Sequence, residues 1–232
     1  MTNLWNMSPS IAAGESLSRL VDRDPPAFAW VNRAQYADAI QTGGSIPDED
    51  GFPLGQVRGV DLSSLPRPRL QCTEPDFAPD LIFWGELFAS GRLVEALALE
   101  SASVQLIDVD CEHCPPAMQA AGYRLLNLLA FANPMDIERS EPADFFSFRN
   151  PDGGEDRVWL FDGAGPGDPA PRIVWRDAFT PPASLFRVPG SPWALATESL
   201  AASVAASGLQ DVAFYDLTAR DRLIERESGA LR

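Results

Sequence analysis

The residues best suited to chemistry lie at positions 111–114, which read Cys-Glu-His-Cys and include the only histidine of the chain, His113. Cys111, Cys114 and the imidazole could bind zinc, with the distant Cys72 as a fourth ligand. The Cys-x-x-Cys spacing is also typical of a redox pair. A structural zinc site normally shows two spaced pairs of ligands, however, and Cys72 has no neighbouring ligand in sequence. We therefore expect an ordinary loop without a metal or other cofactor, and keep zinc binding and redox chemistry as alternatives.

The other polar residues offer little catalytic equipment. All 18 basic residues are arginine, so no lysine is present for a Schiff base, a phosphate-binding loop or general-base catalysis. A Ser-His or Cys-His catalytic pair would have to use His113. The 33 carboxylates could catalyse hydrolysis, but this needs two of them at a fixed separation with different pKa values. No such pair stands out, so the sequence favours a binding protein over an enzyme.

The composition predicts a globular protein with a strongly acidic surface. Hydrophobic residues make up 45% of the 232 positions, and the formal net charge is −15. Such a surface repels nucleic acid, whereas it attracts a basic protein and speeds the encounter with it. Solubility alone is the simpler explanation of the acidity.

No targeting or membrane segment is evident in the sequence. The start of the chain lacks the basic segment and the apolar run of a secretion signal. The most apolar stretch, 125–132, is too short to span a bilayer. We expect a cytoplasmic protein that contacts neither membrane nor nucleic acid.

Local patterns predict short helices and short strands. Residues 16–21 read as a helix and residues 28–31 as a strand. Ser90 fits a helix N-cap, and the apolar spacing after it predicts a helix that reaches Glu100. Residues 123–131 read as one long, largely buried strand. Further short strands are expected at 81–84, 87–89, 104–107, 173–175 and 185–188.

A hairpin is the best-defined local feature. The aromatic run 145–148 leads into a Pro-Asp-Gly-Gly turn, and the chain returns through the apolar run 158–161. Two β-prone runs on either side of such a turn are typical of paired antiparallel strands. We therefore expect residues 150–156 to form a solvent-exposed turn.

Two segments of the chain resemble each other. Residues 87–93 match residues 194–200, since each is a short apolar run followed by a hydroxyl cap and the start of a helix. The strand-like runs behind them also match, at 104–108 and 212–216. The likeness predicts pseudo-duplicated strand–helix–strand units. Its alternative is chance, because short capped helices are common.

These patterns together predict an α+β fold with a mixed, mainly antiparallel sheet and a few short helices. Residues 1–75 are rich in turn signals and read as an irregular N-terminal lobe. We expect this lobe to pack on an α+β domain at 76–232, so that the chain forms one compact unit.

A serial order of strand, hydroxyl-capped helix and buried strand runs from Asp76 to Asp216. Its segments are 87–93, 123–127 with Asp136 and Ser140, 185–187, 195–200 and 208–209. This order resembles the immunity proteins of bacterial polymorphic toxin systems, in the group called immunity protein eleven. The resemblance implies a non-enzymatic protein that binds and neutralises a cognate toxin, and it carries no catalytic residues. The Cys-Glu-His-Cys segment lies outside the shared pattern.

We therefore predict an immunity protein that neutralises a co-encoded toxin in the cytoplasm by stoichiometric binding. Many such toxins are nucleases with basic surfaces, which an acidic protein can cover as a nucleic-acid mimic. The candidate contacts are carboxylates in predicted loops, where side chains stay exposed: Asp48, Glu49, Asp50, Asp152, Glu155 and Asp156. A metal- or carboxylate-dependent hydrolase and a non-enzymatic adaptor are the alternatives.

Overall fold

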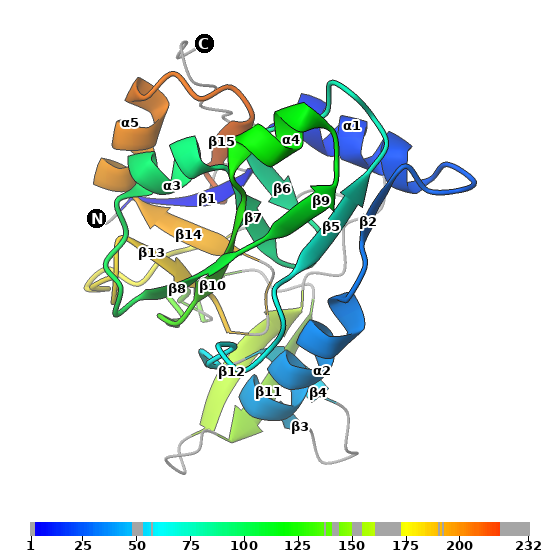
Figure 1. Ribbon diagram of the computed structural model, residues 1–232. Helices are drawn as coiled ribbons and strands as arrows, with labels where there is room; N and C mark the ends of the chain where they lie inside the picture. The colour runs from blue at the N-terminus through cyan, green and yellow to red at the C-terminus, as the bar shows by residue number, and fades with distance from the viewer. Residues whose placement is uncertain are drawn as a thin grey trace.

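The computed structural model describes residues 3–47, 53–56, 58–136, 138–140, 144–149, 155–160, 173–189, 191 and 193–218. Within these residues the predicted α+β class is confirmed, because short helices pack on mostly antiparallel sheets (Figure 1). Two four-stranded sheets form the centre of the molecule. No helix of the described residues combines the length and the apolar character needed to cross a membrane.

The first four-stranded sheet and its helix form a unit that is continuous in sequence apart from one inserted segment. Its elements are β6 (Leu81–Phe83), β7 (Leu87–Ala89), α3 (Gly91–Leu97), β8 (Val104–Asp108) and β10 (Arg124–Leu128). The strand order is β6-β7-β10-β8, and each neighbouring pair is antiparallel. The helix begins at Ser90, as predicted, because the Ser90 Oγ accepts the backbone N–H of Leu93 at 3.2 Å.

The second unit repeats this arrangement, but its fourth strand comes from the other end of the chain. Its elements are β13 (Leu185–Arg187), β14 (Ala194–Thr197), α5 (Glu198–Ala206), β15 (Val212–Tyr215) and β1 (Leu4–Pro9). The order is β13-β14-β1-β15, again antiparallel throughout. Thr197 takes the place of the serine cap, since its Oγ1 accepts the N–H of Leu200 at 3.5 Å.

The two units agree in strand register as well as in order. When β10 of the first unit is aligned with β1 of the second, the three strand pairings of each unit fall into the same register. The equivalent positions are Leu81 and Leu185, Leu87 and Ala194, Leu126 and Met7, and Val104 and Val212. The predicted pseudo-duplication is thus confirmed in topology and register. Beyond the prediction, β1 takes the place that β10 has in the first unit.

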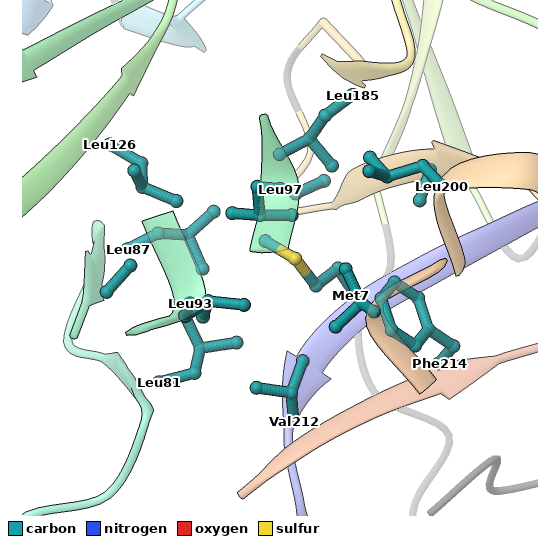
Figure 2. Packing of buried hydrophobic residues seen from close by; sticks show 14 of the residues in the cluster. Met7, Leu81, Leu87, Leu93, Leu97, Leu126, Leu185, Leu200, Val212 and Phe214 are labelled. Carbon is teal, nitrogen blue, oxygen red and sulfur yellow. The ribbon is translucent and has the colours of Figure 1, made fainter. Parts of the chain in front are cut away.

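One hydrophobic cluster holds the two units together. It combines residues from one face of each sheet with the buried sides of α3 and α5, which contact each other. Figure 2 shows Leu87 and Leu126 of the first unit and Met7 and Phe214 of the second converging on this cluster, with Leu97 of α3 near the centre of the view. Burial of this apolar surface is the main force that joins the units.

A buried ion pair also links the units. Arg187 of β13 donates two hydrogen bonds to the carboxylate of Glu86, at 2.6 and 3.1 Å, and both side chains are nearly buried. Glu86 lies in the turn between β6 and β7. The backbone of Arg187 pairs with the chain that follows β10, through Ala130 and Ala132. This paired geometry gives the guanidinium a partner for its charge in the interior.

A third layer covers the other face of the first sheet. It contains α1 (Ile11–Val21), β2 (Phe28–Trp30), β5 (Arg69–Cys72), β9 (Asp110–His113) and α4 (Pro116–Ala121). β5 pairs antiparallel with β2 and parallel with β9. The indole of Trp30 meets the ring of Phe88 edge-on, with centroids 5.0 Å apart. A second hydrophobic cluster fills this interface.

The chain before β5 passes close to the end of β10 at a glycine. A Cβ on Gly59 would lie only 2.6 Å from the Cα of Leu129, so this close approach requires glycine. The buried side chain of Asn127 donates to the carbonyl of Val60 at 2.7 Å and to Gln105 at 2.9 Å. These contacts fix the segment that leads into the third layer.

The remaining elements are one helix and two small two-stranded sheets, at the lower end of Figure 1. They are α2 (Arg33–Gly44), β3 (Ser45–Pro47), β4 (Pro53–Gln56), β11 (Asp144–Arg149) and β12 (Glu155–Leu160). β11 and β12 pair antiparallel, which confirms the paired strands of the predicted hairpin. Residues 150–154 of its expected turn lie outside the described residues. Glu155 and Asp156 belong to β12 and are therefore strand residues, not turn residues.

The strand predicted at 123–131 is shorter than expected. It ends at Leu128, because the N–H groups of Leu129 and Ala130 both donate to the carbonyl of Ser103. The chain then leaves the first sheet and pairs with β13. The apolar run extends past the end of the strand because Ala130 and Ala132 are partly buried against a third hydrophobic cluster, which includes Phe186 of the second unit.

Two other boundaries also differ from the sequence prediction. The helix predicted to reach Glu100 ends at Leu97, because Ala98 adopts a left-handed conformation with φ 44°. The apolar run 173–175 forms a single bridge to Met135 and not a strand.

The first 75 residues are interleaved with later parts of the fold. They supply β1 to the second unit and both β2 and β5 to the third layer. The helix expected at 16–21 is confirmed but begins earlier, at Ile11, after the cap Ser10.

Candidate partner-binding hollows beside helix α1

Two hollows in the surface flank α1. The larger one, which we call the aromatic hollow, has a volume of about 430 Å³ and lies between α1, the end of β1, β15 and the turn after β6. The smaller one, the acidic hollow, has a volume of about 230 Å³ and lies between α1, the segment 76–79 and Asp211. α1 therefore contributes lining residues to both hollows.

The start of α1 is fixed by its cap. The Oγ of Ser10 accepts the N–H of Ala13 at 3.2 Å, and the N–H of Ser10 donates to the backbone carbonyl of Asp211 at 3.1 Å. Leu17 is buried in the second hydrophobic cluster. Gly14 has no atom within 4 Å of the place where a Cβ would lie, so it leaves open space beside the helix.

The aromatic hollow combines apolar walls with one carboxylate. Phe83, Trp84 and Tyr215 contribute rings, and Glu15 is its charged residue. Glu15 is paired with Arg19 at 3.1 Å, but both side chains are largely exposed, so the pair is weak and easily exchanged. The guanidinium of Arg33 already lies over the Trp84 ring, 5.9 Å from its centroid. Aromatic rings beside a carboxylate suit a side chain with an apolar stem and a cationic head.

The acidic hollow is lined by Asp76 and Asp211. Burial raises the pKa of Asp211 above its usual value, and the nearby charge of Asp80 raises it further. Asp80 is almost fully buried and accepts the hydroxyl of Ser90 at 2.6 Å, so it supports the cap of α3. A bound cation would stabilise the ionised form of Asp211.

The charge of the hollows has a single sign. Among the described residues that line either hollow, every charged one is a carboxylate: Glu15, Asp76 and Asp211. The formal charge of the whole chain, −15, has the same sign. The lining of the hollows therefore combines negative charge with apolar residues.

The acidic contacts that the sequence predicts are elsewhere in the chain. Asp48, Glu49, Asp50 and Asp152 lie outside the described residues, and Glu155 and Asp156 lie in β12. Sequence reasoning missed the hollows because segments 8–18, 76–84 and 211–215 come together only in the folded chain. The one local signal was Ser-Pro-Ser at 8–10, which is typical of a helix start.

The three cysteines come together in the third layer. The parallel pairing of β5 with β9 aligns Gln71 with His113, one residue before Cys72 and Cys114. Cys72 and Cys114 are buried, whereas Cys111 is partly exposed. In the part of the chain that the structure describes, no group of three or more His, Cys, Asp or Glu side chains has an arrangement that could hold a metal ion.

Asp136 and Ser140, which belong to the sequence pattern that resembles immunity proteins, stabilise a local turn. The buried Ser140 Oγ accepts the N–H of Val174 at 2.9 Å, and Asp136 forms an ion pair with Arg139 at 2.5 Å. Their contacts are those of residues that shape a loop.

No protein-family model matches the chain, and no curated protein matches it in sequence. The resemblance to immunity proteins therefore stays a prediction.

Proposed function

We propose that this chain is an immunity protein, which neutralises a basic, co-encoded bacterial toxin by stoichiometric binding. The observation that supports this proposal most is the pair of hollows beside α1, whose charged lining residues are all carboxylates. Together with a net charge of −15, they favour a protein partner with exposed arginine or lysine side chains.

The two hollows suit different parts of such a partner. A basic side chain in the aromatic hollow would lay its apolar stem against Phe83 and Trp84 and its charge near Glu15. A second basic side chain would reach Asp76 and Asp211 in the acidic hollow. Buried anchors mainly set the dissociation rate, whereas charges at the rim mainly set the association rate.

A carboxylate-dependent hydrolase is the second candidate, because Asp211 has a raised pKa beside Asp80. Hydrolysis by two carboxylates requires both groups to reach the substrate. Asp80 is buried and bonded to Ser90, and it is not among the residues that line the acidic hollow. The geometry thus supports binding better than acid–base catalysis.

The first experiment asks whether the partner exists. The toxin domain encoded beside this gene is purified and titrated with the full chain by calorimetry, and its activity is measured in parallel. We expect a one-to-one complex and loss of toxin activity at equal concentrations. Absence of a complex, or binding that leaves the toxin active, would overturn the proposed function.

The second experiment tests the place of the interface. Glu15→Arg and Asp76→Arg each reverse a charge in one hollow. Glu95→Arg on α3 is the matched control, because Glu95 is also an exposed helical carboxylate but lines neither hollow. We expect each hollow variant to slow association at low salt by up to about tenfold, since steering by charge contributes that order of rate. Glu95→Arg changes the net charge by the same amount as either single hollow variant and should alter the rate little.

Reversal of the predicted loop contacts is measured in the same series. Asp48→Arg with Asp50→Arg tests one loop, and Asp152→Arg tests the other. If the loop variants slow association and the hollow variants do not, the interface lies at those loops and its placement beside α1 is wrong.

A further inference from the structure

Cys111 is the second residue of β9, and Cys114 directly follows the strand. The N–H of Cys114 donates to the carbonyl of Cys111 at 2.9 Å. Such a turn keeps the first and fourth Cα atoms within about 7 Å, and a disulfide needs about 4.4–6.8 Å. The backbone therefore already holds them near the geometry of a disulfide.

The two thiols differ in exposure and in bonding. Cys111 is partly exposed, whereas Cys114 is 7% exposed and its Sγ donates to the carbonyl of Leu70 at 3.3 Å. The neighbouring Cys114 thiol lowers the pKa of Cys111, whereas the interaction with Cys111 and burial raise the pKa of Cys114. An accessible, more acidic thiol in front of a buried one is the arrangement of an attacking and a resolving cysteine.

Cys72 provides an internal comparison. It is 3% exposed on the neighbouring strand β5, and its Sγ donates weakly to the carbonyl of Glu74 at 3.8 Å. Burial raises its pKa. A buried thiol of this kind attacks disulfides slowly, because the thiolate is the nucleophile.

We infer that Cys111 and Cys114 form a reactive dithiol, which small-molecule disulfides oxidise to an intramolecular disulfide while Cys72 stays reduced. The Cys111 thiolate attacks one sulfur of the disulfide, forms a mixed disulfide and releases one thiolate. Cys114 then loses its proton, attacks the Sγ of Cys111 and expels the second thiolate. The chain loses two electrons and two protons, and the disulfide becomes two thiols.

The neighbouring charges predict which disulfide reacts faster. Asp110 and Glu112 flank Cys111, and the chain as a whole is strongly acidic. A cationic disulfide such as cystamine should therefore react faster than the anionic glutathione disulfide. The difference should shrink as salt is added, because screening weakens both attraction and repulsion.

The test uses the full chain with cystamine and with glutathione disulfide under native conditions. Free thiols are alkylated at intervals, and peptides are mapped by mass spectrometry without reduction. Wild type and Cys72→Ser should lose two thiols and show a Cys111–Cys114 link. Cys114→Ser should stop at a mixed disulfide on Cys111, and Cys111→Ser should lose the fast reaction.

Several results would overturn the inference. One is a disulfide that includes Cys72, and another is a mixed disulfide on Cys111 that persists in wild type. A third is that Cys111 and Cys114 react only after denaturant is added. Near-ultraviolet circular dichroism of the chain without denaturant would confirm that the unreactive protein is folded. The reaction does not depend on the toxin, so its failure leaves the proposed function in place.

Discussion

Asp211 makes the stability of the chain depend on pH in an unusual direction. Burial and the charge of Asp80 raise its pKa in the folded state above the ordinary value of 3.8. The folded chain therefore binds this proton more tightly than the unfolded chain does. The contribution of Asp211 to the free energy of unfolding is fully present below pH 3.8 and falls as pH rises through the folded pKa.

Replacing Asp211 by asparagine should remove this dependence. The amide keeps an oxygen that can accept the N–H of Asp80, as the carboxylate does, but it never ionises. We expect Asp211→Asn to unfold at a slightly higher temperature than wild type at neutral pH and at the same temperature below pH 3.8. Calorimetry across this range is the measurement. A variant that is less stable at neutral pH would show that the carboxylate has a stabilising partner.

The two capped helices, α3 and α5, are equivalent elements in different surroundings. Ser90 accepts the N–H of Leu93 and also donates to the buried Asp80. Thr197 accepts the N–H of Leu200 at a longer distance and has a half-exposed side chain. The cap of the first unit is therefore hydrogen-bonded to a buried carboxylate, whereas the cap of the second unit is partly exposed to water.

Removing each hydroxyl should separate these roles. Thr197→Ala should lower the free energy of unfolding by about 1 kcal/mol, the usual cost of a lost cap. Ser90→Ala should cost about 1–3 kcal/mol more, because Asp80 then loses a hydrogen-bond donor in the interior. Urea unfolding of both variants gives the comparison. Equal losses would mean that the bond between Ser90 and Asp80 adds nothing to stability.

Elements with a local signature were the ones that the sequence could predict. Ser90 and Thr197 predicted their helices as N-cap residues. The aromatic runs on either side of the Gly-Gly sequence predicted the β11–β12 pair. α2 was missed because its apolar residues have no clear helical period, although Tyr36 is fully buried. β1 was missed because only its pairing with β14 and β15, near the other end of the chain, makes it a strand.

The candidate sites likewise differ in how far the sequence could predict them. The Cys-x-x-Cys spacing made a redox pair one of the alternatives, but the burial that distinguishes Cys114 from Cys111 comes from the third layer. The hollows beside α1 have no sequence signature, since Glu15, Asp76 and Asp211 are ordinary acidic residues until the fold brings them to one helix.

At the scale of the whole molecule, the second unit would be continuous in sequence if β1 followed β15 in the chain. β1 and β15 are antiparallel, with Asn6 opposite Tyr215, so the start of β1 lies near the end of β15. A circular permutant that begins at Ser10 and carries residues 3–9 after Thr218, joined by a short glycine–serine linker, should fold to the same structure. It should refold severalfold faster than wild type, because fewer of its contacts are distant in sequence.

Stopped-flow tryptophan fluorescence compares the refolding rates, and near-ultraviolet circular dichroism checks the packing. The matched control is the unpermuted chain ending at Thr218. Equal refolding rates for two folded proteins would mean that the pairing of β1 forms after the rate-limiting step.

The position of β1 has a consequence for the growing chain on the ribosome. Trp5 of β1 bonds to Glu198 of α5, which is 193 residues later. At about 5–20 residues per second, this strand waits roughly 10–40 s for its partners to be made. The first unit has all its strands much earlier, whereas Leu4, Trp5 and Met7 remain an unpaired apolar segment during translation. A chaperone that recognises extended apolar segments would therefore bind this nascent chain at β1.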